Sequence, residues 1–250
     1  MKKRMISRLC ACLVVALCGM PLMAQGVIVY QKDGTKVKFP YELIDSIVTY
    51  NHGEEVEDEP VTPPATEDSR AIDLGLSVKW ASCNVGATSP EEYGGYFAWG
   101  ETTTKSDYSS STSVIYGLSI EELKSRGIID ANGNLTASYD AATANWGGSW
   151  RMPTLDEMKE LLDNCTWEWT TQNGVYGCKV TGPNGNSIFL PAAGYRDNTS
   201  LYIVGYYGHY WSATPYSNSV KAYYLYFCSG KDDWGNLNRY CGHTVRPVSE

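Results

Sequence analysis

Positive charge is scarce in this 250-residue sequence, which has 20 Lys and Arg against 28 Asp and Glu and a formal net charge of −8. Four of the basic residues lie before residue 25, so the rest of the chain carries −12 (−8 minus 4). Nucleic-acid binding needs clustered Lys and Arg that neutralise phosphates. The shortage therefore excludes a nucleic-acid partner and favours one reached through aromatic and neutral polar groups.

Long hydrophobic runs are absent except near the start, where Leu9–Leu17 follows a basic segment. This pattern predicts a signal peptide over residues 1–24, cleaved after Ala24. Lipidation at Cys18 is the alternative, although Leu17 before it is larger than the residue such sites prefer. No later stretch approaches the roughly 18 apolar residues of a membrane helix. We therefore expect an exported chain, secreted or at the outer cell surface, with no membrane-spanning segment.

Closely spaced cysteines are also absent. Once the signal peptide is removed, five cysteines remain and none forms a CxxC pair, so a structural zinc site is not expected. An odd number does not make a disulfide framework, and a domain of this size does not require one. The five are Cys83, Cys165, Cys178, Cys228 and Cys241.

Catalytic motifs are missing as well. The histidines His52, His209 and His243 show no metalloprotease spacing, and no nucleophile elbow, phosphate loop or dinucleotide fingerprint follows a strand-like run. The segment Asp130–Asn134 superficially resembles a calcium loop, but its glycine and the distant bidentate acid are misplaced. We expect a plain turn there, no bound metal, no cofactor and no enzymatic activity.

The chain after the signal peptide divides into three parts. Residues 25–50 contain two β-like runs around Asp33-Gly34, which predicts a hairpin, and a third run at 44–50; together they predict a small β unit. Residues 51–70 hold seven acids and three prolines, which predicts an extended acidic linker. Residues 71–250 form the main domain.

In the main domain, two helices stand out among short strands. Ser119 with Glu122 and Thr154 with Glu157 are capping boxes, which predict helices over about 119–126 and 155–163. Turn residues, including Asp232–Gly235, separate strand-like runs at 165–171, 175–181, 186–191, 220–228 and 240–248. The fold class is therefore α+β, with two short helices followed by antiparallel strands.

Five ordered motifs run through this domain: Ala71–Ala87, Tyr96–Glu101, Trp150–Thr154, Tyr210–Ala213 and Val245–Val248. They resemble the Fibrobacter major paralogous domain, a family similar to the DUF1566 group and to the formylglycine-generating enzyme. The resemblance spans 71–248 and implies a C-type-lectin-like fold and a surface location, with no general enzymatic activity to carry over. The motif tryptophans are expected in the core, and Arg151 and Arg246 are expected to bond backbone carbonyls.

The sequence departs from two functional relatives. Calcium-dependent lectins need carboxylates where this chain has Gly182-Pro183-Asn184 and Trp234-Gly235-Asn236, so calcium-mediated sugar binding is not expected. Formylglycine-generating enzymes need closely spaced cysteines, whereas Cys228 and Cys241 are 13 positions apart. Because their midpoint falls at the predicted Trp234-Gly235 turn, these two fit a cross-strand disulfide.

Tyrosine is abundant in the C-terminal segment, which has ten Tyr, two Trp and one Phe between Tyr195 and Tyr240. No Glu, Gln or Met occurs from Tyr195 to Ser249, as expected if AAC-type codons were randomised at adenines. The segment resembles the variable region of proteins diversified by retroelements. The alternative is a compositional habit of the family.

Tyr with Ser, Asn and Gly is also the composition of antibody paratopes. We therefore expect a ligand-binding or adhesion module that recognises an extracellular protein or glycan. Its alternatives are a formylglycine-generating-like oxidase working through Cys228 and Cys241, and a structural component of a surface fibre. The predicted contact residues are Tyr202, Tyr206, Tyr207, His209, Tyr216, Asn218, Asp232, Asp233, Asn236 and Asn238.

Overall fold

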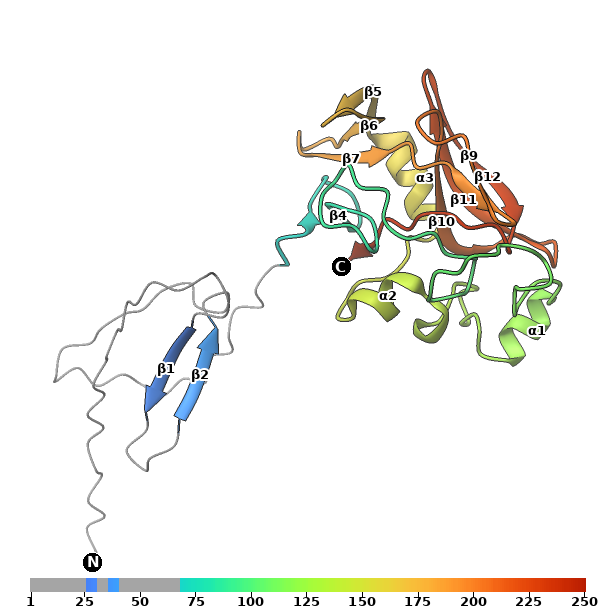
Figure 1. Ribbon diagram of the computed structural model, residues 1–250, viewed down its shortest axis with the longest axis horizontal. Helices are drawn as coiled ribbons and strands as arrows, with labels where there is room; N and C mark the ends of the chain where they lie inside the picture. Colours follow the sequence, from blue (N-terminus) through green and yellow to red (C-terminus); the bar gives the residue numbers. More distant parts are fainter. Residues whose placement is uncertain (1–25, 31–35, 41–67) are drawn as a thin grey trace, which may run out of the picture. The chain divides into compact units, whose positions relative to one another are not determined.

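The computed structural model describes residues 26–30, 36–40 and 68–250 (Figure 1). The predicted signal peptide, the β-like run at 44–50 and the linker up to residue 67 lie outside the described residues. The chain forms two compact units, Met1–Pro63 and Pro64–Glu250. In the first, β1 (Gly26–Tyr30) pairs antiparallel with β2 (Lys36–Pro40), as predicted for the two runs around Asp33-Gly34.

The second unit combines three short α-helices with small antiparallel sheets. The helices are α1 (Ile120–Ser125), α2 (Ala141–Trp146) and α3 (Leu155–Asn164), with a 3₁₀ turn at Ala137–Tyr139. The sheets are β13–β4–β3 (Val248–Ser249, Lys79–Ala81, Ala71–Ile72), β5–β6–β7 (Thr166–Gln172, Val175–Thr181, Ser187–Pro191), β8–β9 (Tyr195–Asp197, Ser200–Tyr202) and β10–β11–β12 (Gly208–Pro215, Lys221–Cys228, Lys231–Asn238). This mixed architecture agrees with the expected α+β class.

Both predicted helices start at the predicted capping boxes. The Thr154 hydroxyl accepts the Glu157 N–H at 3.2 Å, and the Glu157 carboxylate accepts the Thr154 N–H at 2.8 Å. Ser119 and Glu122 make the same reciprocal pair. Helix α2 escaped sequence analysis because its six residues carry no apolar repeat; it begins where the buried Asp140 carboxylate accepts the Thr143 N–H.

Within the β10–β11–β12 sheet, β10 is buried on both faces, β11 is partly buried, and β12 is exposed or half-buried. Tyr210, Leu225 and Phe227 belong to one hydrophobic cluster, which includes the inner face of α3, while Trp211 and Ala222 belong to a second cluster. Successive strand residues point to opposite faces, so neighbours such as Tyr210 and Trp211 enter different clusters. Helix α3 packs against this sheet, as Figure 1 shows. With both faces covered, β10 lacks the alternating pattern that reveals a strand in sequence.

The turn predicted at Asp232–Gly235 was wrong, because this segment is the middle of strand β12. Trp234 lies opposite Leu225 in the β11–β12 pair. The chain reverses instead at Ser229-Gly230, where Gly230 adopts a left-handed φ of 90°. Asp232 and Asp233 are therefore strand residues, and their side chains lie on opposite faces of the sheet.

The strand predicted over 240–248 was also wrong. Only Val248–Ser249 is a strand, and the preceding residues make single bridges to several different segments. The buried Arg246 guanidinium holds this region in place through three hydrogen bonds. It donates to Asn84 Oδ1 at 2.8 Å, and to the carbonyl oxygens of Ala81 at 2.9 Å and Phe189 at 2.8 Å. Apolar periodicity cannot distinguish such a segment, held by one buried cation, from a regular strand.

The motif tryptophans Trp80, Trp99, Trp150 and Trp211 are buried, which confirms their expected place in the core. The indole N–H of Trp99 donates to the Ser212 carbonyl, and that of Trp211 donates to the Phe97 carbonyl, both at 2.9 Å. These bonds tie the motif at 96–101 to the motif at 210–213. The five motifs therefore mark packing positions of the fold.

Candidate functional site

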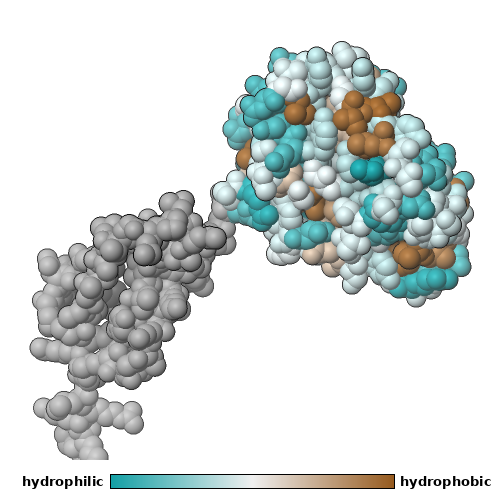
Figure 2. All heavy atoms as spheres, in the orientation of Figure 1, coloured by the Kyte–Doolittle hydropathy of each residue, from teal (hydrophilic) through white to brown (hydrophobic). Residues whose placement is uncertain are grey.

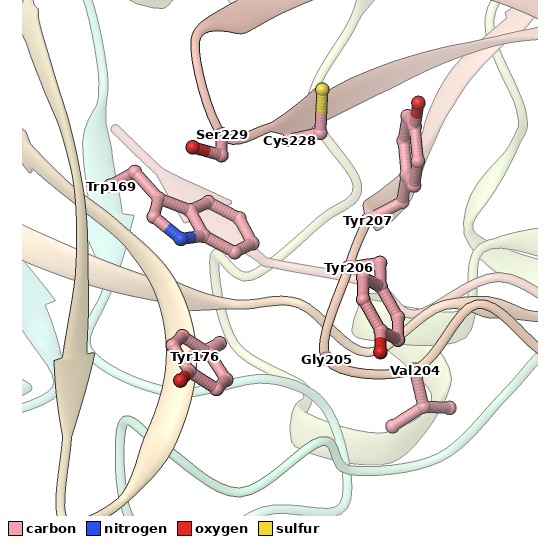
Figure 3. Close-up of a pocket in the computed structure, with 8 residues that line it drawn as sticks. All are labelled: Trp169, Tyr176, Val204, Gly205, Tyr206, Tyr207, Cys228 and Ser229. Carbon is pink, nitrogen blue, oxygen red and sulfur yellow. The ribbon is translucent and has the colours of Figure 1, made fainter.

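A pocket of about 600 Å³ opens where three parts of the main domain meet: the β5–β6 hairpin, the loop before β10 and the turn between β11 and β12 (Figure 3). In Figure 3, Trp169 and Tyr176 stand on one side and Tyr206 and Tyr207 on the other. Val204, Gly205, Cys228 and Ser229 complete the lining, so none of the eight residues is Lys, Arg, His, Asp or Glu. We call this the aromatic pocket.

The first wall of the aromatic pocket belongs to β5 and β6. The rings of Trp169 and Tyr176 lie nearly parallel, with centroids 6.1 Å apart and planes inclined by 12°. The two positions are diagonal neighbours, since Trp169 pairs with Cys178 and Thr171 pairs with Tyr176. Trp169 also contacts Phe227 edge-on at 6.5 Å, which ties this wall to the core.

The second wall is a tight turn. Ile203 has a left-handed φ of 51°, and its carbonyl accepts the N–H groups of both Tyr206 and Tyr207 at 3.1 Å. Gly205, also left-handed, donates its N–H to the Ala192 carbonyl at 2.8 Å. A left-handed conformation is costly for a β-branched residue and is often found at functional sites. The turn holds Tyr206 outward, with 72% of its surface exposed.

Several polar atoms of the pocket have no partner within the protein. In the described part of the chain, the Trp169 indole N–H and the hydroxyls of Tyr176, Tyr206 and Ser229 make no intramolecular hydrogen bond. They are free to bond a ligand. The neighbouring Cys228 side chain raises the pKa of the Tyr207 phenol above its usual value.

Two of the ten predicted contact residues, Tyr206 and Tyr207, line the aromatic pocket. Tyr202 is exposed on β9, where its ring stacks on Tyr195 at 5.6 Å. The other predicted residues lie along β10, β12 and the loop before β11. The structure therefore does not bring the ten together into one surface.

The prediction that His209 is a surface contact residue was wrong, because this side chain is only 6% exposed. Its ring lies between those of Tyr195 and Tyr224, each 5.0 Å away and nearly parallel. Burial lowers the pKa of His209 to about 4. The prediction failed because Tyr195 of β8 and Tyr224 of β11 cover the His209 ring, and local composition cannot reveal such long-range contacts.

The remaining predicted residues mainly make local contacts. Tyr216 packs edge-on against Tyr223, and Asn218 accepts the Val220 N–H at 2.9 Å. Within the β11–β12 region, Lys221 bonds Asn236, Asn238 bonds Tyr240, and Asp233 accepts the Trp234 N–H. Asp232 is exposed opposite Phe227.

The disulfide expected between Cys228 and Cys241 is not formed, and both thiols are free. Cys228 lies at the turn end of the β11–β12 hairpin, opposite Lys231, whereas Cys241 follows Asn238 at the open end. Eight strand residues span roughly 20 Å or more, whereas disulfide-bonded Cα atoms lie within about 7 Å. Burial raises the pKa of Cys241 to about 12.

Trp169 and Tyr176 were not among the predicted contact residues, because both lie outside the Tyr-rich segment 195–240. A signal was available in the run Thr166–Gln172, where Trp167 and Trp169 alternate with polar residues on a predicted strand. Such alternation places two indoles on one strand face. It could have marked a second aromatic surface.

Within the described residues, no group of three or more His, Cys, Asp or Glu side chains could hold a metal ion. None of the helices there is both long enough and apolar enough to cross a membrane. Hydrophobic residues form only small, separate patches on the face of the main domain that Figure 2 shows. The aromatic pocket combines a cavity of about 600 Å³ with polar atoms that have no hydrogen-bond partner in the described part of the chain.

These features define a small α+β domain with an aromatic pocket that no Lys, Arg, Asp or Glu lines. The chain belongs to the Lcl C-terminal domain family, whose model matches residues 71–249. This family is DUF1566-like, which confirms that part of the expected resemblance, and its domains are typically extracellular or associated with the cell surface. No curated protein and no solved structure matches the chain.

Proposed function

We propose that this protein is an exported, non-enzymatic binding module that recognises an extracellular protein or glycan through the aromatic pocket. The observation that carries the proposal is the meeting of four aromatic side chains from separate elements around an uncharged cavity of ligand size. Family membership supports a place at the cell surface. The signal peptide over 1–24 and a C-type-lectin-like fold are parts of the same proposal.

Retroelement diversification would act on one wall only. Tyr206 and Tyr207 lie inside the Tyr-rich segment 195–240, whereas Trp169 and Tyr176 lie outside it. Such a pocket would combine a variable wall with a constant one. The test is the neighbouring DNA, where a near-copy of the segment encoding 195–248 that differs only at adenines, beside a reverse transcriptase, would support diversification.

The oxidase alternative is disfavoured by the separation of Cys228 from Cys241 and by the burial of Cys241. It predicts formylglycine formation on a cysteine-bearing peptide that both Cys228→Ser and Cys241→Ser abolish; this result would overturn the binding proposal. The fibre alternative predicts that the purified chain self-associates, which light scattering would detect.

The binding proposal itself is tested by interferometry of residues 25–250 against immobilised matrix proteins and polysaccharides. We expect saturable binding that Trp169→Ala and Tyr206→Ala each weaken. Tyr216→Ala is the matched control, because Tyr216 lies outside the pocket. Binding that survives both pocket substitutions would show that the ligand is recognised elsewhere.

A further inference from the structure

We propose that the aromatic pocket binds an uncharged sugar ring of a glycan, without a metal ion. This inference rests on the proposed binding function and narrows its ligand to one chemical class. Three properties of the pocket carry it: the absence of charge in its lining, the ring faces of its walls and the free hydroxyls between them.

Charge is missing where a charged ligand would need it. No Lys, Arg, Asp or Glu lines the pocket. The nearby Lys231 is engaged elsewhere, since its ammonium lies 5.1 Å from the centre of the Tyr226 ring and 3.7 Å from the Asp233 carboxylate. An ionic ligand would lose hydration in the pocket without gaining a counter-charge. Phosphorylated, sulfated and uronic-acid ligands are therefore disfavoured.

The walls offer flat aromatic faces. Trp169 and Tyr176 present nearly parallel rings on one side, and Tyr206 stands across from them (Figure 3). Aromatic faces carry partial negative charge, which attracts the weakly positive C–H groups on the flat side of a pyranose ring. The cavity of about 600 Å³ lies within the range of small-molecule sites, so a ring and its attached neighbours can enter.

The free polar atoms distinguish a sugar from a peptide. The hydroxyls of Tyr176, Tyr206 and Ser229 can each donate and accept, and the Trp169 N–H donates. A sugar matches this set because its hydroxyls also donate and accept. A proline-rich peptide, which aromatic grooves also bind, offers mainly carbonyl acceptors and would leave the acceptor capacity unused. The pocket chemistry therefore favours the sugar.

The experiment is affinity electrophoresis of residues 25–250 in gels containing a neutral α-glucan, β-glucan, xylan, mannan or galactan. Heparin and a polyproline peptide, measured by calorimetry, are the charged and peptide comparisons. We expect retardation by at least one neutral polysaccharide, with 5 mM EDTA present or absent. Trp169→Ala and Tyr206→Ala should each weaken binding by about tenfold or more.

The controls are Trp234→Ala and Tyr216→Ala, which remove partly exposed aromatic rings outside the pocket. They should change affinity by less than about twofold, and melting curves verify that every variant folds. Tyr206→Phe keeps the ring and should lose less affinity than Tyr206→Ala. If only polyproline or a matrix protein binds, and through Trp169 and Tyr206, the sugar inference is wrong while the proposed function stands. Polysaccharide binding that both pocket variants retain would refute the site, and heparin binding alone would refute the uncharged ligand.

Discussion

The rings of His209 and His243 meet edge to face beneath the aromatic residues of β8 and β11, with centroids 5.2 Å apart and planes at 84°. Both are buried, and His243 also stacks on Trp211 at 3.8 Å. Within the described residues, Nδ1 of His209 and both ring nitrogens of His243 have no hydrogen-bond partner. A proton on either ring would enter an apolar, fully packed cluster.

The first prediction is loss of stability in mild acid. Burial lowers the pKa of His209 to about 4 and holds that of His243 well below 6.5. Between pH 6.5 and 4 these two histidines are therefore protonated in the unfolded chain but not in the folded domain. The free energy of unfolding falls as the pH drops through this range. The slope should approach about 1.4 kcal/mol per pH unit for each histidine.

Urea unfolding at a series of pH values measures that slope. His209→Phe and His243→Phe should each reduce it, because they keep an aromatic ring and remove the titrating group. His52→Phe, outside the main domain, is the control. A slope that neither substitution changes would show that other groups cause the acid sensitivity.

The second prediction concerns thiol reactivity. Burial raises the pKa of Cys165 to about 11 and those of Cys178 and Cys241 to about 12, and Cys83 is also buried. Cys228 is free and lines the aromatic pocket. Iodoacetamide at about pH 8 should therefore modify Cys228 first in the folded protein, as peptide mass spectrometry can determine. Cys228→Ser should remove the fast phase, and faster labelling of Cys241 would contradict the arrangement.

The third prediction is that Ile203→Asn stabilises the domain. Ile203 holds a left-handed φ of 51°, which Asn tolerates better than a β-branched residue. We expect a gain of about 1 kcal/mol in the free energy of unfolding, measured by urea denaturation. Leu201→Asn is a matched control, since Leu201 and Ile203 are 40% and 39% exposed and Leu201 has an ordinary φ. If Ile203→Asn lowers the free energy of unfolding as much as Leu201→Asn does, the backbone at Ile203 is not strained.

The fourth prediction concerns the start of the main domain. Asp68 accepts hydrogen bonds from Arg70 Nε at 2.9 Å and from the Trp150 indole at 2.7 Å, and the Arg70 guanidinium lies 4.1 Å from the centre of the Trp146 ring. We expect limited proteolysis between Glu54 and Glu67, leaving a stable core that begins by Asp68. Arg70→Ala should let cleavage advance into the core, whereas Arg126→Ala, which removes a surface pair, should not. Native cleavage within 140–190 would contradict this boundary.

The fifth prediction is indifference to chelators. In the segment Asp130–Asn134, which superficially resembles a calcium loop, Asp130 Oδ1 accepts the Asn134 N–H at 2.9 Å and the two backbones also bond. The carboxylate thus closes a turn. EDTA should leave the melting temperature unchanged, and a downward shift restored by calcium would contradict the expectation.

Elements that depend on neighbouring residues could be predicted from the sequence, whereas pairing between distant segments could not. The capping boxes at Ser119 and Thr154 and the strand at Val175–Thr181 depend on neighbouring residues and were predicted correctly. The turn predicted at Asp232–Gly235 failed because Asp and Gly favour turns, but pairing with β11 keeps this segment extended.

The candidate site shows the same division. Composition pointed to Tyr206 and Tyr207, because a Tyr-rich segment is typical of a recognition surface. It could not reveal Trp169 and Tyr176, which reach the pocket only because β5 and β6 fold back beside the loop before β10. Nor could it show that His209 lies under Tyr195.

The small β13–β4–β3 sheet has a mechanical consequence. Strands β3 and β13 both pair with β4, so the first and last strands of the main domain flank β4 on its two edges, with the C-terminus beside β4 (Figure 1). A tensile load between a surface anchor on the N-terminal side and a captured ligand would enter through the two residue pairs that join β3 to β4. Under such a load the hydrogen bond from the Trp150 indole to Asp68 should break first, because it lies closest to the predicted acidic linker.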